Sequence, residues 1–333
     1  MSDTIMSYEE VVDLAARCLK ANGANDENAL AVARTIARAE RDGSASHGFF
    51  RLPGYVASLK SGKVNGRARP KVVRHAGSVV RIDADNGFAP LALEAGIPDL
   101  VATARESGIA AGALVNMYHF AALWPEAEKI AEAGLVGFTC TAFKPSVAPA
   151  GATAPLFGTN PMAFAWPRHN ARPMVFDMAT AAMARGEIMI AARDGHELPP
   201  GVGLDKNGQP TTDPSAVLEG VMLPFGGYKG SNLAMMIELL VAALIGEQFS
   251  FEAAETDNND GGPPRGGEFL LAIDPAHMGA DDSDAHAEAF FARYNAMDGT
   301  RMPGDRRYAN RDAAENGINV PQSTIDKVNE LMA

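Results

Sequence analysis

The chain carries a histidine and an arginine four residues apart, His47 and Arg51, in the run SHGFFR at positions 46–51. Histidine is the side chain best suited to exchange a proton near neutral pH. The planar guanidinium of arginine binds a carboxylate through two hydrogen bonds. If the run is helical, both side chains share one face, so that one protonates a substrate that the other holds, with Ser46 orienting the imidazole. The alternative is a partly buried structural histidine beside a surface arginine.

Two further polar runs stand beside predicted strands. NMYHFAALWP at 116–125 follows one strand and precedes a helix, where α/β sheets expose backbone N–H groups to ligands. An aromatic corner of the core would explain this run equally well. In PLFGTNP at 155–161 the hydroxyl of Thr159 could meet a ligand, although turn formation alone accounts for these residues.

The run FDMAT at 176–180 ends a predicted strand and is expected to start a helix. Asp177 or Thr180 is the natural N-cap of that helix, and capping is the simpler interpretation of both residues. Glu187 follows about two turns later and could face the same cleft. A solvated carboxylate is the more common outcome for such a position.

Glycines and basic residues are concentrated in two later runs. LPFGGYKGS at 223–231 leads into an apolar helix, and its three glycines, Lys229 and the helix N-terminus could cradle a phosphate. RMPGDRR at 301–307 holds three arginines, as a phosphate or adenosine site would, although a solvated basic turn is the usual alternative.

The overall composition excludes several classes of protein. The chain has 333 residues and a net charge of −12, with 47% hydrophobic and 21% charged residues. We therefore expect a globular protein with two domains, or one domain with a large insertion. No cluster of five Lys or Arg residues occurs, which disfavours nucleic-acid or anionic-membrane binding.

The sequence gives no indication of disulfide bonds, secretion or membrane insertion. Cys18 and Cys140 lie far apart in apolar contexts, so we expect small core residues and neither a disulfide nor a metal site. The N-terminus lacks a signal-peptide pattern. The most apolar window, 233–245, contains Glu238 and is too short to span a bilayer. The expected location is the cytoplasm.

Hydrophobic periodicity and turn residues predict an α+β organisation. A capping box of Ser7 and Glu10 opens the first helix, which Asn22-Gly23 closes. Further helices are expected at about 27–42, 55–62, 125–132, 187–193, 231–245 (buried), 284–297 and 324–332. Strands are expected at about 72–82, 109–115, 135–141, 162–166, 174–178 and 269–273, and residues 256–267 read as a mobile surface loop.

The glycine pattern that marks the common dinucleotide-binding fold is absent. No G-x-G-x-x-G occurs, and the nearest candidates, Gly87 and Gly96, are too far apart. P-loop, H-E-x-x-H and G-x-S-x-G patterns are also missing, which removes the main support for NTPase, zincin and α/β-hydrolase functions. If a nicotinamide binds, another architecture must hold it.

Taken together, these runs resemble the type 2 malate/L-lactate dehydrogenase family. The match covers nearly the whole chain in order: SHGFFRLPGY, HFAALWP, PLFGTNPMAFAWP, VFDMAT, LPFGGYKGS and RMPGDRR. Within the family, HFAALWP, RMPGDRR and the TTDP at 211–214 are most similar to the Δ1-piperideine-2-carboxylate/Δ1-pyrroline-2-carboxylate reductases. The resemblance implies a non-Rossmann nicotinamide-binding fold, with a mixed-sheet domain and a helical domain formed by both chain ends. It also implies a homodimer. We predict a helical substrate domain at 1–115 joined by 280–333, and an NAD(P)-binding domain at 116–279.

The resemblance also assigns roles to individual residues. It makes His47 the proton donor with Ser46 beside it, and it places Arg51 and Thr159 on the substrate. Glu187 stands where the similar reductases have an Asp that joins the His/Ser relay, and Tyr118 stands where a second His is expected. The implied cofactor contacts are His119, Phe120, Ala121, Ala122, Leu123, Asp177, Met178, Ala179, Tyr228, Lys229, Arg301, Met302, Pro303, Gly304, Asp305, Arg306 and Arg307.

The resemblance therefore implies an NADPH-dependent reductase of cyclic imino acids, with NADH as the other possible cofactor. One alternative is a 2-oxo or 2-hydroxy acid dehydrogenase of the same fold, because the same histidine and arginine suit a ketone. A second alternative, from another class, is a nucleotide-binding protein without catalytic activity, for which the Glu187 replacement is the one sequence indication.

Overall fold

The computed structural model describes residues 3–280 and 282–333. The N-terminal part is helical, with α1 at Tyr8–Ala21, α2 at Asp26–Arg41 and α3 at Leu52–Lys60. The predicted capping box is confirmed, because Glu10 N donates to Ser7 Oγ at 3.2 Å and Ser7 N donates to Glu10 Oε2 at 2.7 Å. These helices bury their apolar faces against one another.

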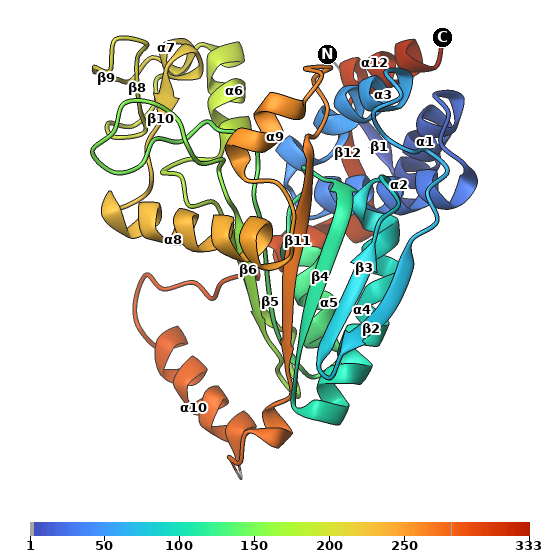
Figure 1. Ribbon diagram of the computed structural model, residues 1–333, viewed down its shortest axis with the longest axis vertical. Helices are drawn as coiled ribbons and strands as arrows, with labels where there is room; N and C mark the ends of the chain where they lie inside the picture. Colours follow the sequence, from blue (N-terminus) through green and yellow to red (C-terminus); the bar gives the residue numbers. More distant parts are fainter. Residues whose placement is uncertain (1–2, 281) are drawn as a thin grey trace.

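The two ends of the chain pack together, at the same end of the molecule in Figure 1. Strand β1 (Asp3–Met6) pairs antiparallel with β12 (Ile318–Pro321), and α12 (Gln322–Met332) lies against α1. Ile318, Val320 and Val328 join the core of the N-terminal helices. The helical layer at this end thus uses both chain ends, as the sequence predicted.

A seven-stranded mixed sheet forms the centre of the molecule (Figure 1). Its spatial order is β2-β3-β4-β11-β5-β6-β7, and among these neighbours only β3 and β4 run parallel. The predicted strand at 72–82 is a hairpin of two strands, with Gly77 at a positive φ in its turn. The strands are β2 Lys71–Ala76, β3 Val79–Asp83, β4 Ile109–Tyr118, β5 Val136–Thr141, β6 Met162–Trp166, β7 Met174–Met178 and β11 Arg265–Ile273.

Helices cover both faces of this sheet. On one face α4 (Ala89–Ser107) and α5 (Trp124–Glu132) pack against side chains such as Leu114 and Leu270. On the other face α8 (Tyr228–Glu238) and the π-helical turn that follows it (Leu239–Leu244) pack on residues such as Cys140 and Phe269. Both cysteines are buried and free, as expected.

The remaining elements lie around this core (Figure 1). Helix α10 stands apart from the sheet, and α6 and α7 lie beside a small sheet of order β10-β8-β9. No helix in the described part of the chain is long and apolar enough to cross a membrane. The elements are α6 Arg185–Asp194, β8 Gly203–Leu204, β9 Pro210–Thr211, α7 Pro214–Glu219, β10 Val221–Met222, α9 Ser250–Thr256, α10 Ser283–Asn295 and α11 Asp305–Ala313.

One sequence prediction about the C-terminal half is wrong. The helical segment 231–245 is not buried all round, because Met235, Leu239 and Leu244 are each more than half exposed. The predicted irregular segment at 256–267 is confirmed for residues 257–264, between α9 and β11, and its mobility stays a prediction. Lys63 forms ion pairs with this loop, of 2.9 Å to Asp257 and 2.6 Å to Asp260. A run of Asp, Asn and Gly indicates a loop, but not the distant lysines that fix it.

The predicted division of the chain at residue 115 stays a prediction. Strand β4 continues through this position, and β2 and β3 belong to the same sheet as β5 to β7.

Candidate active site

His47 and Arg51 lie on two short 3-10 turns, Ala45–His47 and Phe49–Arg51. The predicted single helix with a shared face is wrong, because Gly48 between them has φ −89° and ψ −136°. The break is held by Glu40 of α2, whose Oε1 accepts a hydrogen bond of 2.6 Å from Phe49 N. A Cβ atom at Gly48 would overlap the Glu40 carboxylate, so the absence of a side chain permits this contact.

The His47 imidazole is neutral in the free protein. Ser46 Oγ lies 3.0 Å from its Nδ1, as the sequence predicted for an orienting hydroxyl. Burial lowers the His47 pKa to about 3, and the positive charge of Arg51 and the proximity of His119 add to the effect. A negative charge bound beside Arg51 would offset these contributions and raise the pKa of His47.

Arg51 is a cation without an acidic partner. Its guanidinium carbon lies 5.0 Å from the centre of the Phe120 ring and 5.6 Å from that of Phe50. Its Nε atom is buried and has no hydrogen-bond partner, and no carboxylate among the described residues forms an ion pair with it. Because a buried charge is costly unless it is paired, this arrangement suits the binding of an external anion.

The first turn of α6 approaches the same two side chains. A Cβ atom at Gly186 would lie 3.1 Å from Ser46 Cβ and 3.4 Å from Arg51 Nη2. Arg185, which the sequence analysis did not single out, is close enough to Arg51 to lower its pKa. Glu187 is exposed, and no hydrogen bond joins its side chain to Ser46 or His47 in the described chain.

Asp177 has a different role from the one that its position predicted. It lies in β7, and α6 begins only at Arg185, so neither Asp177 nor Thr180 is the N-cap of the next helix. Instead, Asp177 Oδ2 accepts hydrogen bonds from Leu123 N at 2.8 Å and Trp124 N at 3.0 Å, at the start of α5. The carboxylate therefore joins the 119–123 segment to β7.

Thr159 and the start of α8 meet at the residues that follow β7. Thr180 donates to the Thr159 carbonyl from its backbone N at 2.9 Å and from Oγ1 at 3.0 Å. Phe225 N donates to the Thr180 carbonyl at 3.0 Å. Gly226 and Gly227 have positive φ values of 56° and 62°, which glycine adopts without strain, and they lead into α8.

The basic run at 301–307 also lies against β7. Val175 N donates to Pro303 O at 3.3 Å, and Arg307 Nη2 donates to Val175 O at 2.7 Å while its guanidinium lies over the Trp124 ring. Arg301 and Arg306 are exposed. Asp177–Ala179 begins in β7, and hydrogen bonds join the other three predicted cofactor segments, or residues a few positions before them, to β7 or to the residues directly after it.

His119 supports the prediction that this region binds a ligand. Its side chain is buried, and neither ring nitrogen has a hydrogen-bond partner in the described chain. Burial lowers its pKa to about 4, so the ring is neutral. Unpaired nitrogens at His119, the glycine-led N-terminus of α8 and the exposed Lys229 fit the polar and anionic parts of a dinucleotide.

Two buried carboxyl groups near the site escaped the sequence analysis. Glu126 on α5 and Glu268 on β11 are both buried, and Thr139 donates a hydrogen bond to Glu268. Burial raises the pKa of Glu268 to about 7, and burial together with the charge of Glu268 raises that of Glu126. Glu268 stands in an otherwise ordinary strand pattern, and no sequence signal pairs it with Glu126.

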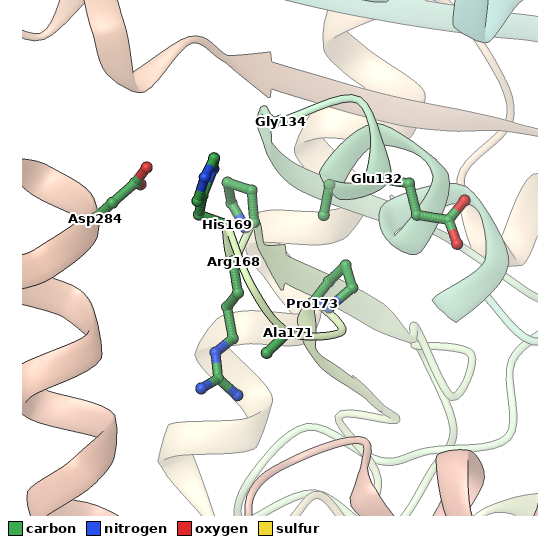
Figure 2. A pocket seen from close by; sticks show the side chains of 9 residues that line it. Glu132, Gly134, Arg168, His169, Ala171, Pro173 and Asp284 are labelled. Atoms are coloured by element: carbon green, nitrogen blue, oxygen red, sulfur yellow. The ribbon is translucent and has the colours of Figure 1, made fainter.

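A hollow of about 400 Å³ lies elsewhere, at the far end of α5 (Figure 2). Asp284 of α10 lies on one side of it, and His169 of the β6–β7 turn lies on the other. Arg168 Nη2 forms a 2.6 Å ion pair with Glu288, which joins α10 to this turn. None of the predicted site residues lines the hollow.

The chain is an oxidoreductase of a class that uses a nicotinamide cofactor, although its sequence lacks the usual glycine pattern. The chain belongs to the malate/L-lactate dehydrogenase family, whose model matches residues 6–329. The prediction from the ordered motifs is therefore confirmed.

Three relatives show how close the match is. A protein of Ancylobacter novellus named Δ1-pyrroline-2-carboxylate reductase is 48% identical over 98% of this chain and 97% of its own length. A Pseudomonas putida protein named Δ1-pyrroline-2-carboxylate/Δ1-piperideine-2-carboxylate reductase is 46% identical over 98% and 96%. The crystal structure of Δ1-piperideine-2-carboxylate reductase from Pseudomonas syringae pathovar tomato superposes with a TM-score of 0.94, at 44% identity and 98% and 99% coverage.

Proposed function

We propose that this enzyme reduces Δ1-pyrroline-2-carboxylate and Δ1-piperideine-2-carboxylate to L-proline and L-pipecolate, with NADPH as the reductant. Relatives that carry these names match almost the entire chain at 46% and 48% identity. The observation in the site that carries the proposal is Arg51, a cation with a buried, unpaired Nε beside His47. Every substrate of this class has a carboxylate next to the carbon that is reduced.

Arg51 binds that carboxylate, and Thr159 contacts the substrate from the opposite segment. A bound reduced nicotinamide supplies the hydride that adds to C2 as the C2=N double bond becomes single. His47 holds the proton at the ring nitrogen, which gains an N–H bond. The arriving carboxylate raises the pKa of His47 from its low value, so substrate binding itself prepares the proton donor. Fixing the substrate against the cofactor supplies much of the acceleration.

The cofactor lies along the segments that meet at β7: His119–Leu123, Asp177–Ala179, Tyr228–Lys229 and Arg301–Arg307. The Asp177 carboxylate is already engaged by α5, so its segment contacts the cofactor through the backbone or through Met178 and Ala179. Arg307 is likewise engaged with β7. Arg301, Arg306 and Lys229 are the exposed cations of these segments, and they support NADPH over NADH because a 2′-phosphate needs cationic partners.

Glu187 serves in the proposed relay with Ser46 and His47. Its side chain is exposed in the first turn of α6, next to Gly186, where an added Cβ atom would lie 3.1 Å from Ser46 Cβ. The relay predicts that Glu187→Asp stays active and that Glu187→Gln alters the pH dependence of kcat. An unchanged pH profile in Glu187→Gln would remove Glu187 from the relay.

The test is the oxidation of NADPH and NADH followed at 340 nm with four acids in parallel: the two cyclic imines, pyruvate and oxaloacetate. We expect a strong preference for the cyclic imines and for NADPH. Turnover confined to pyruvate or oxaloacetate would replace the substrate by an open-chain 2-oxo acid. Saturable NADPH binding without turnover of any acid would favour a nucleotide-binding protein without catalysis.

The exposed apolar side of α8 supports the proposal that the enzyme is a homodimer. Met235, Leu239 and Leu244 are more than half exposed along this helical segment, and so are Phe290 on α10 and Met297 just after it. Large exposed apolar patches mark interaction surfaces. Light scattering should give twice the monomer mass, and Leu239→Glu should lower it. A monomeric wild-type protein would contradict the dimer.

A further inference from the structure

Arg185 is a second cation at the site, and it lies on a different element from Arg51. It is the first residue of α6, and its side chain is half-buried. It forms no ion pair and no hydrogen bond with another side chain among the described residues, and burial lowers its pKa. The other arginine of this helix, Arg193, is exposed and paired with Asp194 at 2.6 Å.

Arg185 and Arg51 are held near each other although their charges repel. The start of α6 lies against the SHGFFR run, because a Cβ atom at Gly186 would come within 3.1 Å of Ser46 Cβ and 3.4 Å of Arg51 Nη2. The positive charge of Arg185 contributes to the lowered pKa of Arg51. Two guanidinium groups thus lie close together, and neither forms an ion pair with an acid of the described chain.

We propose that Arg185 is a second ligand of the substrate carboxylate, which it binds together with Arg51. This inference rests on the proposed function, because it takes the anion at Arg51 to be the substrate. A substrate contact is favoured over a cofactor phosphate, because Arg185 is near enough to Arg51 to lower its pKa and the adjacent Gly186 lies beside Ser46. No hydrogen bond or ion pair in the described structure joins Arg185 to Lys229 or to the 301–307 run. Two arginines on separate elements would fix the plane of the carboxylate, and hence which face of C2 meets the cofactor.

The variants are Arg185→Gln, Arg185→Lys and, as the matched control, Arg193→Gln on the same helix. The ligand is pyrrole-2-carboxylate, a planar and unreactive ring acid, titrated by calorimetry into the holoenzyme with NADPH present. We expect Arg185→Gln to raise its Kd about tenfold or more, because hydrogen bonds to charged groups are among the stronger ones. Arg185→Lys should recover part of the affinity, and Arg193→Gln should bind like the wild type.

Two further measurements separate a carboxylate ligand from a structural or cofactor role. The Kd of NADPH for Arg185→Gln should stay within about twofold of wild type, and the ligand-free variant should melt no lower than wild type because an unpaired cation has been removed. In turnover, KM should rise more than kcat falls. An unchanged Kd for pyrrole-2-carboxylate would overturn the proposal, and so would a loss of NADPH affinity instead.

Different results would show that the cyclic-imine substrate is wrong or that Arg185 does not bind the carboxylate. If the wild type reduces only an open-chain 2-oxo acid, the cyclic-imine proposal is wrong. The KM of that acid in Arg185→Gln and Arg193→Gln then tests Arg185, because its carboxylate occupies the same place. A selective rise in Arg185→Gln supports the second ligand, and equal KM values in the two variants overturn it.

Discussion

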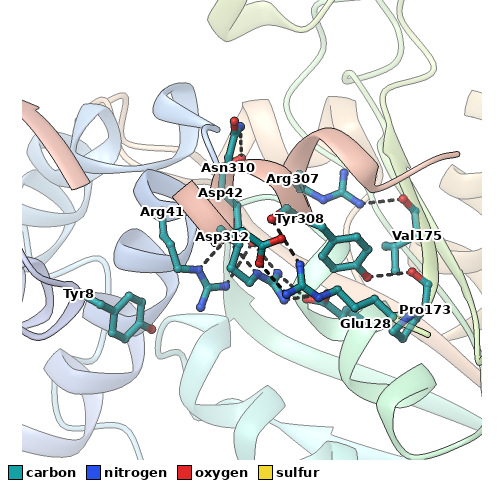
Figure 3. A network of polar contacts seen from close by, with 12 residues as sticks. Tyr8, Arg41, Asp42, Glu128, Pro173, Val175, Arg307, Tyr308, Asn310 and Asp312 are labelled. Atoms are coloured by element: carbon teal, nitrogen blue, oxygen red, sulfur yellow. Dashed lines mark hydrogen bonds and ion pairs between the residues drawn. The ribbon is translucent and has the colours of Figure 1, made fainter. Parts of the chain in front are cut away.

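Two groups of arginines in this protein face opposite electrostatic situations. Arg311 of α11 donates to Asp42 at 2.6 Å and to Glu128 at 2.9 Å. These bonds join α11 to the residue that follows α2 and to the middle of α5, where Figure 3 shows Asp42 and Glu128. These partners raise the pKa of Arg311 further above the ordinary value. Arg51 and Arg185 instead have no acidic partner in the described structure, and burial lowers the pKa of each.

The difference separates charges that build the fold from charges that serve the site. Around Arg311 every charged group has its counterion, and Arg41 adds a 2.7 Å contact to Asp42. A substitution there leaves a buried carboxylate unpaired, which is costly. Around Arg51 the free-energy cost of an unpaired buried charge is already present in the free protein, and a bound anion removes that cost. The account therefore predicts opposite outcomes when each type of arginine is replaced.

The largest effect is expected for Arg51→Met. Loss of the carboxylate ligand and of substrate orientation should lower kcat/KM by about 10³- to 10⁴-fold. The stability to urea should stay the same or rise, because an unpaired cation has been replaced by an apolar chain of similar length. Steady-state kinetics test the loss of kcat/KM, and equilibrium unfolding tests the stability. A kcat/KM within tenfold of the wild-type value would contradict the proposed role of Arg51.

Arg311→Met should show the converse result. Removing the cation leaves Glu128 without an ion-pair partner among the described residues and leaves Asp42 with Arg41 alone, so the free energy of unfolding should fall by about 3 to 5 kcal/mol. The protein that remains folded at low temperature should keep kcat/KM near the wild-type value, since Arg311 contacts no predicted site residue. Unchanged stability would mean that the paired cluster is not structural.

Glu268→Gln tests the buried carboxyl pair through pH. The pKa of Glu268 is raised in the folded protein to about 7, so the folded state retains a proton that the unfolded state releases above about 4.5. The stabilisation is therefore full below pH 4.5 and lost as pH rises to 7. The stability of wild type relative to Glu268→Gln should fall by about 3 kcal/mol over that range. A pH-independent difference would contradict the raised pKa.

The smallest effect concerns Glu40, which positions the SHGFFR run. Glu40→Gln keeps an oxygen that accepts from Phe49 N and should retain activity, whereas Glu40→Ala should lower kcat about tenfold by loosening the turn. The His47 ring signals in NMR should shift in Glu40→Ala and return toward wild type in Glu40→Gln. Equal activity in Glu40→Ala and wild type would assign Glu40 to the fold alone.

The sequence predicted the helices and strands with strong local patterns. The Ser7–Glu10 capping box, the strands at 162–166 and 174–178 and the turn at Asn22-Gly23 are each encoded by neighbouring residues, and they appear in the structure. Strands β1 and β12 went unpredicted because four residues at each end become a strand only by pairing with each other. The exposed side of the 231–245 helical segment was missed because continuous apolar content does not say what covers it.

The connections within the candidate site were predictable only in part, and its membership stays a prediction. Ordered motifs identified His47, Arg51 and the segments around β7, yet spacing wrongly placed His47 and Arg51 on one helix and Asp177 at the start of the next. Those errors share a cause: Glu40 and the α5 N-terminus are distant in sequence from the groups that they bind. Arg185 was overlooked for the same reason: its sequence context is ordinary, and only the fold brings it near Arg51.

The most direct measurement is the rate of NADPH oxidation with Δ1-pyrroline-2-carboxylate by the wild-type protein and by His47→Ala. The account predicts ready turnover by the wild type and a fall in kcat of about 10²- to 10⁴-fold in the variant, as loss of a proton donor gives. The affinity for pyrrole-2-carboxylate should be retained, since Arg51 is intact. Near-normal turnover by His47→Ala would show that another group supplies the proton and would contradict the account.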